Sequence, residues 1–287
     1  MIKKSQKISW GVVGVGRAGR ARASAISEDP HSELTALSRG RFAGQFFVPD
    51  IGFDALLARV EAVAICSPNE CHVAQVGAAL AAGCHTVVEF PLAPSAGQAK
   101  QLFAQAHAAG VLLHVEHIEL LLAWHRTLKE RVKGPFEVAM RMTKKGTGRE
   151  SFEAMRGALV ARLHNLSGLS PIDAVVAVSC TPGLLELELK LVQGTAHFTL
   201  EYGPALGRET ELDLRDDTTL WRVRQHRLYR DQQAIDLPVL DRSLFAQDHH
   251  RFMAQLKHNA APYVSADQVV AVLAHVDTIA AAALVQR

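Results

Sequence analysis

The stretch that decides the fold is Ile8–Gly19, I-S-W-G-V-V-G-V-G-R-A-G. It begins with a β-forming apolar run and ends in the pattern G-x-G-x-x-G, and helix-like residues follow it. Glycines at these positions permit a tight turn and let backbone N–H groups approach a pyrophosphate at a helix amino terminus. Because the motif lies between a predicted strand and a predicted helix, it indicates a dinucleotide-binding loop. The residues expected at the pyrophosphate are Gly14, Val15, Gly16, Arg17, Ala18 and Gly19.

Strand-like and helix-like segments alternate through the first 117 residues. The apolar runs L-T-A-L-S, E-A-V-A-I-C-S, H-T-V-V-E-F and V-L-L-H-V-E are separated by segments of helical composition, two of which close with glycine. Such alternation is typical of a parallel, doubly wound sheet with right-handed crossovers. We therefore predict an α/β chain whose residues 1–117 form a nucleotide-binding Rossmann domain.

The remaining residues, 118–287, have a different texture. Several runs after Gly134 alternate apolar and polar residues with period two, which is typical of antiparallel strands with one buried face. We predict a carboxy-terminal α+β domain that forms the substrate cleft, with the terminal helices free to pack back on the first domain. The helices expected here are residues 118–132, residues 151–169 and two terminal helices from Leu244 onward, separated by Pro262.

Composition and charge narrow the class of protein. The chain has 287 residues, 48% of them hydrophobic, and a formal net charge of +2 without basic blocks, which argues against a nucleic-acid partner. No signal-peptide run and no uncharged stretch of membrane-spanning length is evident. The four cysteines form no C-x-x-C pair. These features predict a cytoplasmic protein with free thiols, without a membrane partner, acting on a small molecule.

The end of the second predicted strand bears on the choice of cofactor. NAD-preferring sites usually place an acid there for the ribose hydroxyls, but the sequence from Thr35 is T-A-L-S-R-G-R. Ser38, Arg39 and Arg41 suit a 2′-phosphate instead, because guanidinium groups bind phosphate oxygens with two hydrogen bonds. We therefore expect NADPH, with NADH as a weaker cofactor; the alternative is a solvated loop with two arginines.

The next two strands also end in residues suited to a ligand, since open α/β sheets bind ligands at the carboxyl ends of their strands. One such end is C-S-P-N-E-C-H, residues 66–72, and the other lies in V-V-E-F-P-L-A-P, residues 87–94. His72 is either a catalytic base or, as we favour, a structural residue. The residues expected near the ribose and nicotinamide are Cys66, Ser67, Pro68, Asn69, His72 and Glu89.

A further stretch, H-V-E-H-I-E at residues 114–119, is rich in titratable groups. Its histidines are three apart and lack the H-E-x-x-H spacing of a zinc site, so we expect no metal. Glu116 and Glu119, one turn apart, either face a cleft or occupy the first turn of a helix, where acids are favourable.

Residues 65–93, with I-C-S-P-N-E-C-H and A-A-G-C-H-T-V-V-E-F-P-L-A, resemble the Gfo/Idh/MocA oxidoreductases. The resemblance implies a nucleotide-binding domain followed by a domain built on a large, open, mostly antiparallel sheet. The usual E-K-P triplet of that family falls at Glu89-Phe90-Pro91. Its lysine serves as general acid/base when a carbinol is oxidised, and Phe90 cannot do this, which puts sugar or inositol oxidation in doubt.

One branch of that family, the biliverdin reductases, carries E-Y-P at this place and shares L-L-H-V-E-H-I-E-L-L, here Leu112–Leu121. This resemblance implies an NADPH-dependent biliverdin reductase that transfers hydride from nicotinamide C4 to the C10 methine of biliverdin IXα, giving bilirubin, as a monomer or weak homodimer. It implies Arg162, Glu116 and His117 as catalytic candidates, with Arg162 holding a propionate or a water rather than donating a proton. The residues expected in the bilin pocket are Phe90, Glu116, His117, Arg162 and Tyr202.

Two alternatives remain open on the sequence. One is a sugar or polyol dehydrogenase whose base has moved to His72 or His117. The other is a non-catalytic NADPH-binding sensor.

Overall fold

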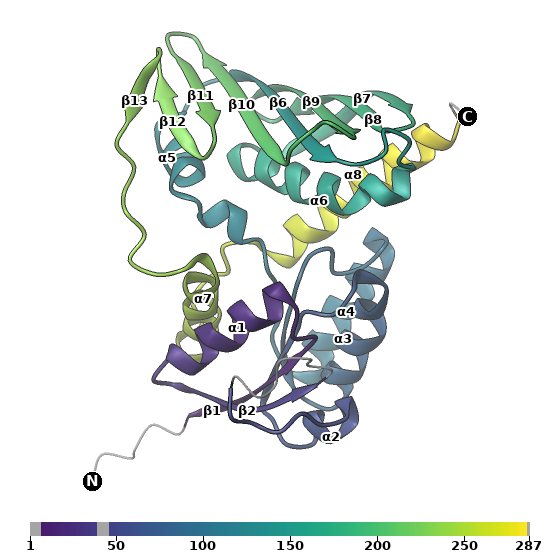
Figure 1. Ribbon diagram of the computed structural model, residues 1–287, viewed down its shortest axis with the longest axis vertical. Coiled ribbons are helices and arrows are strands. Elements are labelled where there is room, and N and C mark those ends of the chain that lie inside the picture. Colours follow the sequence, from purple (N-terminus) through teal and green to yellow (C-terminus); the bar gives the residue numbers. More distant parts are fainter. Residues whose placement is uncertain (1–6, 39–45, 286–287) are drawn as a thin grey trace. The chain divides into compact units, whose positions relative to one another are not determined.

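The computed structural model describes residues 7–38 and 46–285, which form two compact units (Figure 1). The first unit comprises the chain up to Ile118 together with Asp241–Val270, and the second comprises Glu119–Leu240 together with the chain from Ala271 onward. The first unit therefore includes a segment from near the end of the chain.

The first unit is built on a five-stranded sheet with the order β2-β1-β3-β4-β5, in which all neighbours are parallel. This confirms the predicted Rossmann sheet. Its strands are β1 (Ile8–Val13), β2 (Ser32–Ser38), β3 (Ala62–Ile65), β4 (His85–Val88) and β5 (Leu113–Val115). Its helices are α1 (Arg17–Glu28), α2 (Phe53–Leu57), the 3₁₀ turn η2 (Asn69–Cys71), α3 (His72–Ala81), α4 (Ala96–Ala109) and α7 (Leu244–His258).

The core of this sheet is apolar on both faces, as a parallel sheet covered by helices requires. All four residues of β3 are buried, and Trp10 and Val12 of β1 are fully buried. Helix α7 completes the core from the far end of the sequence: the ring of Phe252 meets Trp10 edge to face, with the centroids 5.4 Å apart. Phe252 and Met253 belong to the same buried cluster as the strands.

The second unit is built on an eight-stranded sheet with the order β13-β12-β11-β10-β6-β9-β8-β7. Only β6 and β9 run parallel among its described neighbours, so the predicted mostly antiparallel sheet is confirmed. Its strands are β6 (Phe136–Lys145), β7 (Ile172–Thr181), β8 (Leu184–Leu191), β9 (Gly194–Gly203), β10 (Glu209–Asp216), β11 (Leu220–Arg224), β12 (Arg227–Arg230) and β13 (Gln233–Ile235). Its helices are η3 (Ile118–Leu121, a 3₁₀ turn at the start), α5 (Ala123–Arg131), α6 (Phe152–Leu169) and most of α8 (Ala266–Val285).

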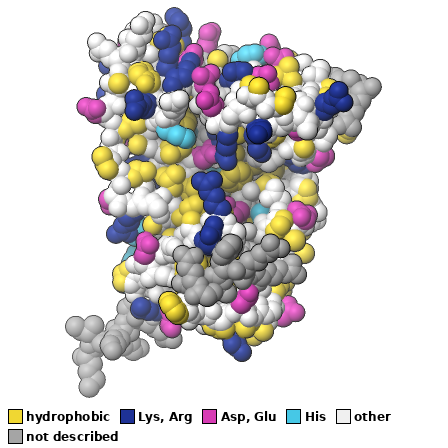
Figure 2. All heavy atoms as spheres, viewed as in Figure 1, with side chains coloured by type: hydrophobic (Ala, Val, Ile, Leu, Met, Phe, Trp, Pro, Cys, Tyr) yellow, Lys and Arg dark blue, Asp and Glu magenta, His cyan; other side chains and the backbone are white. Residues whose placement is uncertain are grey.

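One face of this second sheet is buried and the other is charged. Side chains alternate between buried and exposed along β6, β8 and β9, which produces the period-two pattern of the sequence. Helix α6, buried over most of its length, packs on the sheet. The other face carries exposed ion pairs such as Arg141–Glu201 and Arg224–Asp213. Basic and acidic side chains are also interspersed over the face of the molecule shown in Figure 2.

Two sequence-based expectations for this unit were wrong. The helix predicted over residues 118–132 is divided into η3 and α5, because Leu122 between them has an extended backbone (φ −58°, ψ 136°). Three strands, β7, β12 and β13, were not predicted. Strand β7 lies at one edge of the sheet, where its valines stay partly exposed and no alternation is imposed, and β12 and β13 are short strands at the other edge.

Helix α8 is long and apolar enough to cross a membrane by length and composition alone, over Ala266–Leu284 with a mean hydropathy of 1.4. It nevertheless has the features of a packed helix. Val269, Val272 and Val276 form part of a buried stripe at helical spacing. Asp277 is also paired with Arg156 of α6 at 3.2 Å.

Candidate active site

Two of the three motif glycines are required by backbone packing. Gly14 has a φ of +83° and its N–H donates to the Ser38 carbonyl at 2.9 Å, which joins the loop to the end of β2. A Cβ at Gly14 would lie 2.7 Å from the Cys66 carbonyl oxygen, and a Cβ at Gly19 would overlap the Gly14 carbonyl. These two glycines therefore allow the tight turn that the sequence predicted.

Gly16 is different, because a Cβ there would meet nothing within 4 Å. It is the N-cap of α1, whose first turn has no side-chain cap and no acidic residue. Among the described residues no side chain caps the N–H groups of this turn or opposes the helix dipole with a first-turn acid, an arrangement that suits a phosphate. Of the other motif residues, Arg17 is exposed, Ala18 is half-buried and Val15 is buried, so Val15 contributes through its backbone.

The end of β2 supports the loop but leaves the choice of cofactor open. Ser38 is buried, with 1% of its surface exposed, and its carbonyl is occupied by Gly14. Arg39 and Arg41 lie outside the described residues, so their role at a 2′-phosphate stays a prediction.

The segment after β3 divides into exposed and buried residues. Pro68 and Asn69 are exposed at the edge of the sheet, where a ligand could reach them. His72 is fully buried, and its two ring nitrogens lie 2.8 Å from the Pro91 carbonyl and 2.9 Å from the Ser67 carbonyl. His72 thus joins the segments that follow β3 and β4, as expected of a structural residue.

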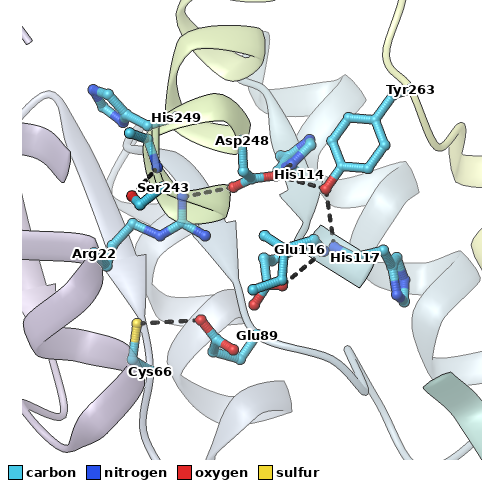
Figure 3. Close-up of polar contacts among 12 residues, drawn as sticks. Arg22, Cys66, Glu89, His114, Glu116, His117, Ser243, Asp248, His249 and Tyr263 are labelled. Atoms are coloured by element: carbon cyan, nitrogen blue, oxygen red, sulfur yellow. Dashed lines mark hydrogen bonds and ion pairs between the residues drawn. The ribbon is translucent and has the colours of Figure 1, made fainter. Parts of the chain in front are cut away.

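Two carboxyl groups meet where β4 and β5 end (Figure 3). Glu116 has only 1% of its surface exposed; its Oε1 accepts a hydrogen bond from Ile118 N at 2.9 Å, and its side chain is hydrogen-bonded to Glu89. Burial, together with the hydrogen bond and negative charge of Glu89, raises the pKa of Glu116 well above its usual range. Glu116 therefore keeps its proton to a higher pH than an ordinary carboxyl group does.

An aromatic surface lies beside this pair. Phe90 directly follows Glu89, and its ring stacks on the buried ring of His117 with the centroids 5.5 Å apart and the planes inclined by 17°. The Phe90–Pro91 peptide bond is cis. At the family's lysine position this chain thus presents a flat apolar ring.

In the second unit, Arg162 lies in a buried polar cluster. It forms an ion pair with Glu119, and its Nη1 donates to Thr210 Oγ1 at 3.0 Å. Burial and the nearby charge of Arg208 lower the pKa of Arg162 to about 10, so the guanidinium remains charged at neutral pH. Arg208, which the sequence analysis missed, lies 3.7 Å from Glu119 and is mostly exposed.

Tyr202 of β9 is also in the second unit and is buried. Its hydroxyl has no hydrogen-bond partner among the described residues, and the Lys144 ammonium lies 5.3 Å from its ring centroid. The site residues predicted from the sequence thus fall into two groups: Tyr202 and Arg162 in the second unit, and the others that are described in the first.

Three residues near the carboxyl pair were missed on the sequence: Arg22, Asp248 and Tyr263. They form a buried network with His114, in which Asp248 contacts Arg22 at 2.6 Å, His114 at 2.8 Å and Tyr263 at 2.6 Å. The sequence contained only a weak indication of this network: Arg22 is a charged residue on a face of a predicted helix that otherwise carries small residues. Asp248 lies 134 residues beyond its partner His114.

Comparison with known proteins accounts for the first unit. Residues 8–117 match the sequence model of the Gfo/Idh/MocA oxidoreductase family, described as having an NAD-binding Rossmann fold. The match covers most of the first unit and none of the second. The expected resemblance and the nicotinamide dinucleotide as cofactor class are thereby confirmed.

Curated proteins similar to this chain include two kinds of enzyme. Biliverdin reductase A of Mus musculus is 38% identical over 130 residues, which are 43% of this chain and 44% of that protein. UDP-N-acetylglucosamine 3-dehydrogenase of Acidithiobacillus ferrooxidans is 34% identical over 117 residues, 38% of this chain and 36% of that protein. The matches therefore span less than half the length of these curated relatives.

A solved structure extends the likeness to both units. Biliverdin reductase from Synechocystis, in complex with biliverdin and NADP⁺, is 25% identical with a TM-score of 0.84, covering 96% of this chain and 98% of that one. The predicted combination of a Rossmann domain with a large, mostly antiparallel sheet is thus confirmed.

Proposed function

We propose that this protein is an NADPH-dependent biliverdin reductase. The observation that carries the proposal is the Glu89–Glu116 pair beside Phe90: the site offers a buried acid and a flat ring, where a carbinol dehydrogenase needs a base. A reduction consumes a proton, and an oxidation of an alcohol releases one. The raised pKa of buried Glu116 makes it a proton donor rather than a base, which suits the reductive direction.

In the proposed reaction, the C10 methine carbon of biliverdin receives a hydride, which carries two electrons, and a pyrrole-type nitrogen receives a proton. NADPH supplies the hydride from nicotinamide C4 and becomes NADP⁺. Glu116 is the proton donor in this proposal, and it regains a proton from solvent through Glu89, the more exposed carboxyl of the pair. Gly16 and the first turn of α1 hold the pyrophosphate, which fixes the donor carbon in position.

The substrate's shape fits the remaining candidates. The stacked rings of Phe90 and His117 offer a face for a flat conjugated tetrapyrrole. The second unit separately contains two cations that suit a propionate, Arg162 and the exposed Arg208. Because Arg162 is already paired with Glu119, Arg208 is the cation better placed to gain a new carboxylate partner.

Two finer points belong to the same proposal. NADPH is expected over NADH, and the Synechocystis biliverdin reductase structure with NADP⁺ supports this choice. Reduction of a free bilin is expected in the cytoplasm, as the composition predicts.

The test is incubation of the purified protein with NADPH and biliverdin IXα, followed by loss of the biliverdin absorption band and growth of the bilirubin band. Glu116→Gln should lower kcat by about 10²–10⁴, the usual contribution of general acid catalysis. Glu28→Gln, which changes an exposed glutamate of the same domain, should leave kcat unchanged. No bilirubin from the wild-type protein at any pH between 5 and 9 would refute the proposal.

The relative that oxidises a nucleotide sugar favours a second candidate, a nucleotide-sugar dehydrogenase. That reaction needs a base near the carbinol, and both nitrogens of His72 already face carbonyl oxygens. The two candidates separate in one assay: NADP⁺ reduction with UDP-N-acetylglucosamine, and no bilirubin formation, would select the dehydrogenase.

A further inference from the structure

Arg22 is a buried cation with unused hydrogen-bonding capacity. It lies in the second turn of α1, is fully buried, and its Nη1 contacts Asp248 Oδ2 at 2.6 Å. Its Nε and Nη2 have no hydrogen-bond partner among the described residues. Leaving such donors unpaired inside a protein costs free energy, so the placement of this charge calls for a reason beyond its single ion pair.

Figure 3 shows what surrounds the guanidinium. Asp248 lies on one side, and Glu89, Glu116 and the Cys66 thiol lie on the other. These three groups and Asp248 are also the acidic neighbours that favour the charged form of Arg22, against the opposing effect of burial. A single buried cation thus lies between a fixed carboxylate and the carboxyl pair of the active site.

Asp248 is held as an anion by a complete set of partners. Besides Arg22, its oxygens contact His114 Nε2 at 2.8 Å and accept from the Tyr263 hydroxyl at 2.6 Å. Arg22, His114 and Tyr263 together lower the pKa of Asp248, against the opposing effect of burial. The Tyr263 oxygen in turn accepts from the backbone N–H of His117 at 3.0 Å, so this network also fixes the residue that follows Glu116.

We propose that Arg22 and Asp248 are positioning residues that act in opposite directions on how firmly the Glu89–Glu116 pair holds its proton. This inference rests on the proposed function, because it concerns the proton that the reduction consumes. Arg22 favours the ionised pair and limits proton retention. Asp248 favours the protonated pair and keeps Arg22 in place.

The charges that face Glu116 support these signs. Burial and Glu89 raise the pKa of Glu116, Arg22 lowers it, and Asp248 raises it with a smaller effect than Arg22. Burial raises the pKa values of Cys66 and Tyr263, so both are neutral near pH 7. Among the described residues, two histidines are the remaining titratable groups near Glu116. His114 is hydrogen-bonded to Asp248, and the ring of His117 is stacked on Phe90. A neighbouring opposite charge commonly shifts a carboxyl pKa by about 1–3 pH units, so loss of Arg22 should produce a measurable change in the titration of Glu116.

The experiment has two readouts on the full-length protein. The first is the infrared C=O band of protonated carboxylic acid, titrated against pH without bilin and isolated by subtraction of Glu116→Gln. The second is kcat against pH with NADPH and biliverdin IXα. Arg22→Gln should move the midpoint of the band, and the alkaline limb of kcat, upward by about one pH unit or more. Asp248→Asn should move both downward.

Two further variants distinguish an electrostatic effect from a disturbed fold. Arg22→Lys retains the charge and should titrate close to the wild type. Arg22→Gln combined with Asp248→Asn removes both charges from the buried site, and because the effect of Arg22 is the larger, its midpoint should still rise, by less than in Arg22→Gln alone. Arg59→Gln, an exposed change in the same unit, serves as control.

The inference is overturned if Arg22→Gln and Asp248→Asn move the band in the same direction, or if the folded double variant moves it downward or not at all. Because the infrared titration needs no bilin, it separates this inference from the proposed function. A protein that makes no bilirubin but shows the opposed shifts would refute the activity and support the assignment of Arg22 and Asp248.

Discussion

The imidazole ring of His117 lies face to face with the phenyl ring of Phe90, with the centroids 5.5 Å apart. The two residues follow neighbouring strands, β4 and β5, so the stack joins the ends of those strands at the place where the family's lysine would stand. Position 90 therefore has a flat aromatic surface and no group that can transfer a proton.

Substitutions at Phe90 should therefore act through shape. Phe90→Leu removes the stack and should lower kcat/KM for biliverdin by about 2- to 12-fold, since aromatic pairs contribute about 0.5–1.5 kcal/mol beyond burial. Phe90→Tyr keeps the ring and should retain the wild-type value within about twofold. Phe90→Lys should not produce NADP⁺-dependent sugar oxidation. Steady-state kinetics on the three variants check this, and sugar oxidation by the lysine variant would contradict it.

Substitutions at two glycines of the motif should have different effects, one on stability and the other on cofactor binding. Gly19→Ala places a Cβ against the Gly14 carbonyl, so its Tm should fall by several degrees, as expected for a loss of about 1–3 kcal/mol. Gly16→Ala meets open space, so its Tm without cofactor should match the wild type while its Kd for NADPH rises at least tenfold. Calorimetry and fluorescence titration measure the two effects. Unchanged NADPH binding in Gly16→Ala would place the pyrophosphate elsewhere.

Arg39 should determine the preference for NADPH. Loss of a charge-assisted hydrogen bond costs about 1.5–3 kcal/mol, so Arg39→Ala should weaken NADPH binding by roughly 10- to 150-fold and leave NADH binding nearly unchanged. Arg59→Ala, at an exposed arginine of the same unit, is the control. Equal losses for both cofactors would show that Arg39 does not contact the 2′-phosphate.

A buried histidine predicts acid sensitivity in the second unit. Burial lowers the pKa of His125 to about 4, and its Nε2 is hydrogen-bonded to the Asn165 carbonyl. The folded state thus binds fewer protons than the unfolded state between about pH 6.5 and 4. The free energy of unfolding should therefore fall as pH drops through this window, by up to about 1.4 kcal/mol per pH unit from this group.

Urea unfolding between pH 4.5 and 7.5 tests the sign. His125→Gln should be less stable at pH 7 but show a shallower loss toward pH 4.5 than the wild type. His258→Gln, at an exposed histidine, should keep the wild-type slope. A slope that is the same in all three proteins would exclude His125 as its source.

The sequence predicted those features whose physical cause lies within a few neighbouring residues. The glycine motif needs a turn between a strand and a helix, and the structure has that turn at Gly14–Gly19. Period-two alternation predicted β6 and β9 because only one face of their sheet is buried. Leu122 could not be predicted to interrupt a helix, since the leucine spacing around it is compatible with either a continuous helix or two short ones.

The carboxyl pair shows the limit for the site. Glu89 and Glu116 were both singled out, but their meeting depends on β4 and β5 being neighbours and on the burial of Glu116. Arg22 and Asp248, 226 residues apart in the sequence, leave no local pattern at all. Their charges become informative only when the fold brings them together.

The position of α7 in the first unit has a consequence for biosynthesis. Trp10 of the first strand packs on Phe252, and Arg22 finds its carboxylate at Asp248. A nascent chain that has emerged only to residue 118 has neither partner. At 5–20 residues per second, the ribosome needs on the order of ten seconds more to deliver them. The amino-terminal half must therefore wait, incompletely packed, for a segment made near the end of translation, and a fragment cut at the apparent domain boundary would carry an unpaired charge in its interior.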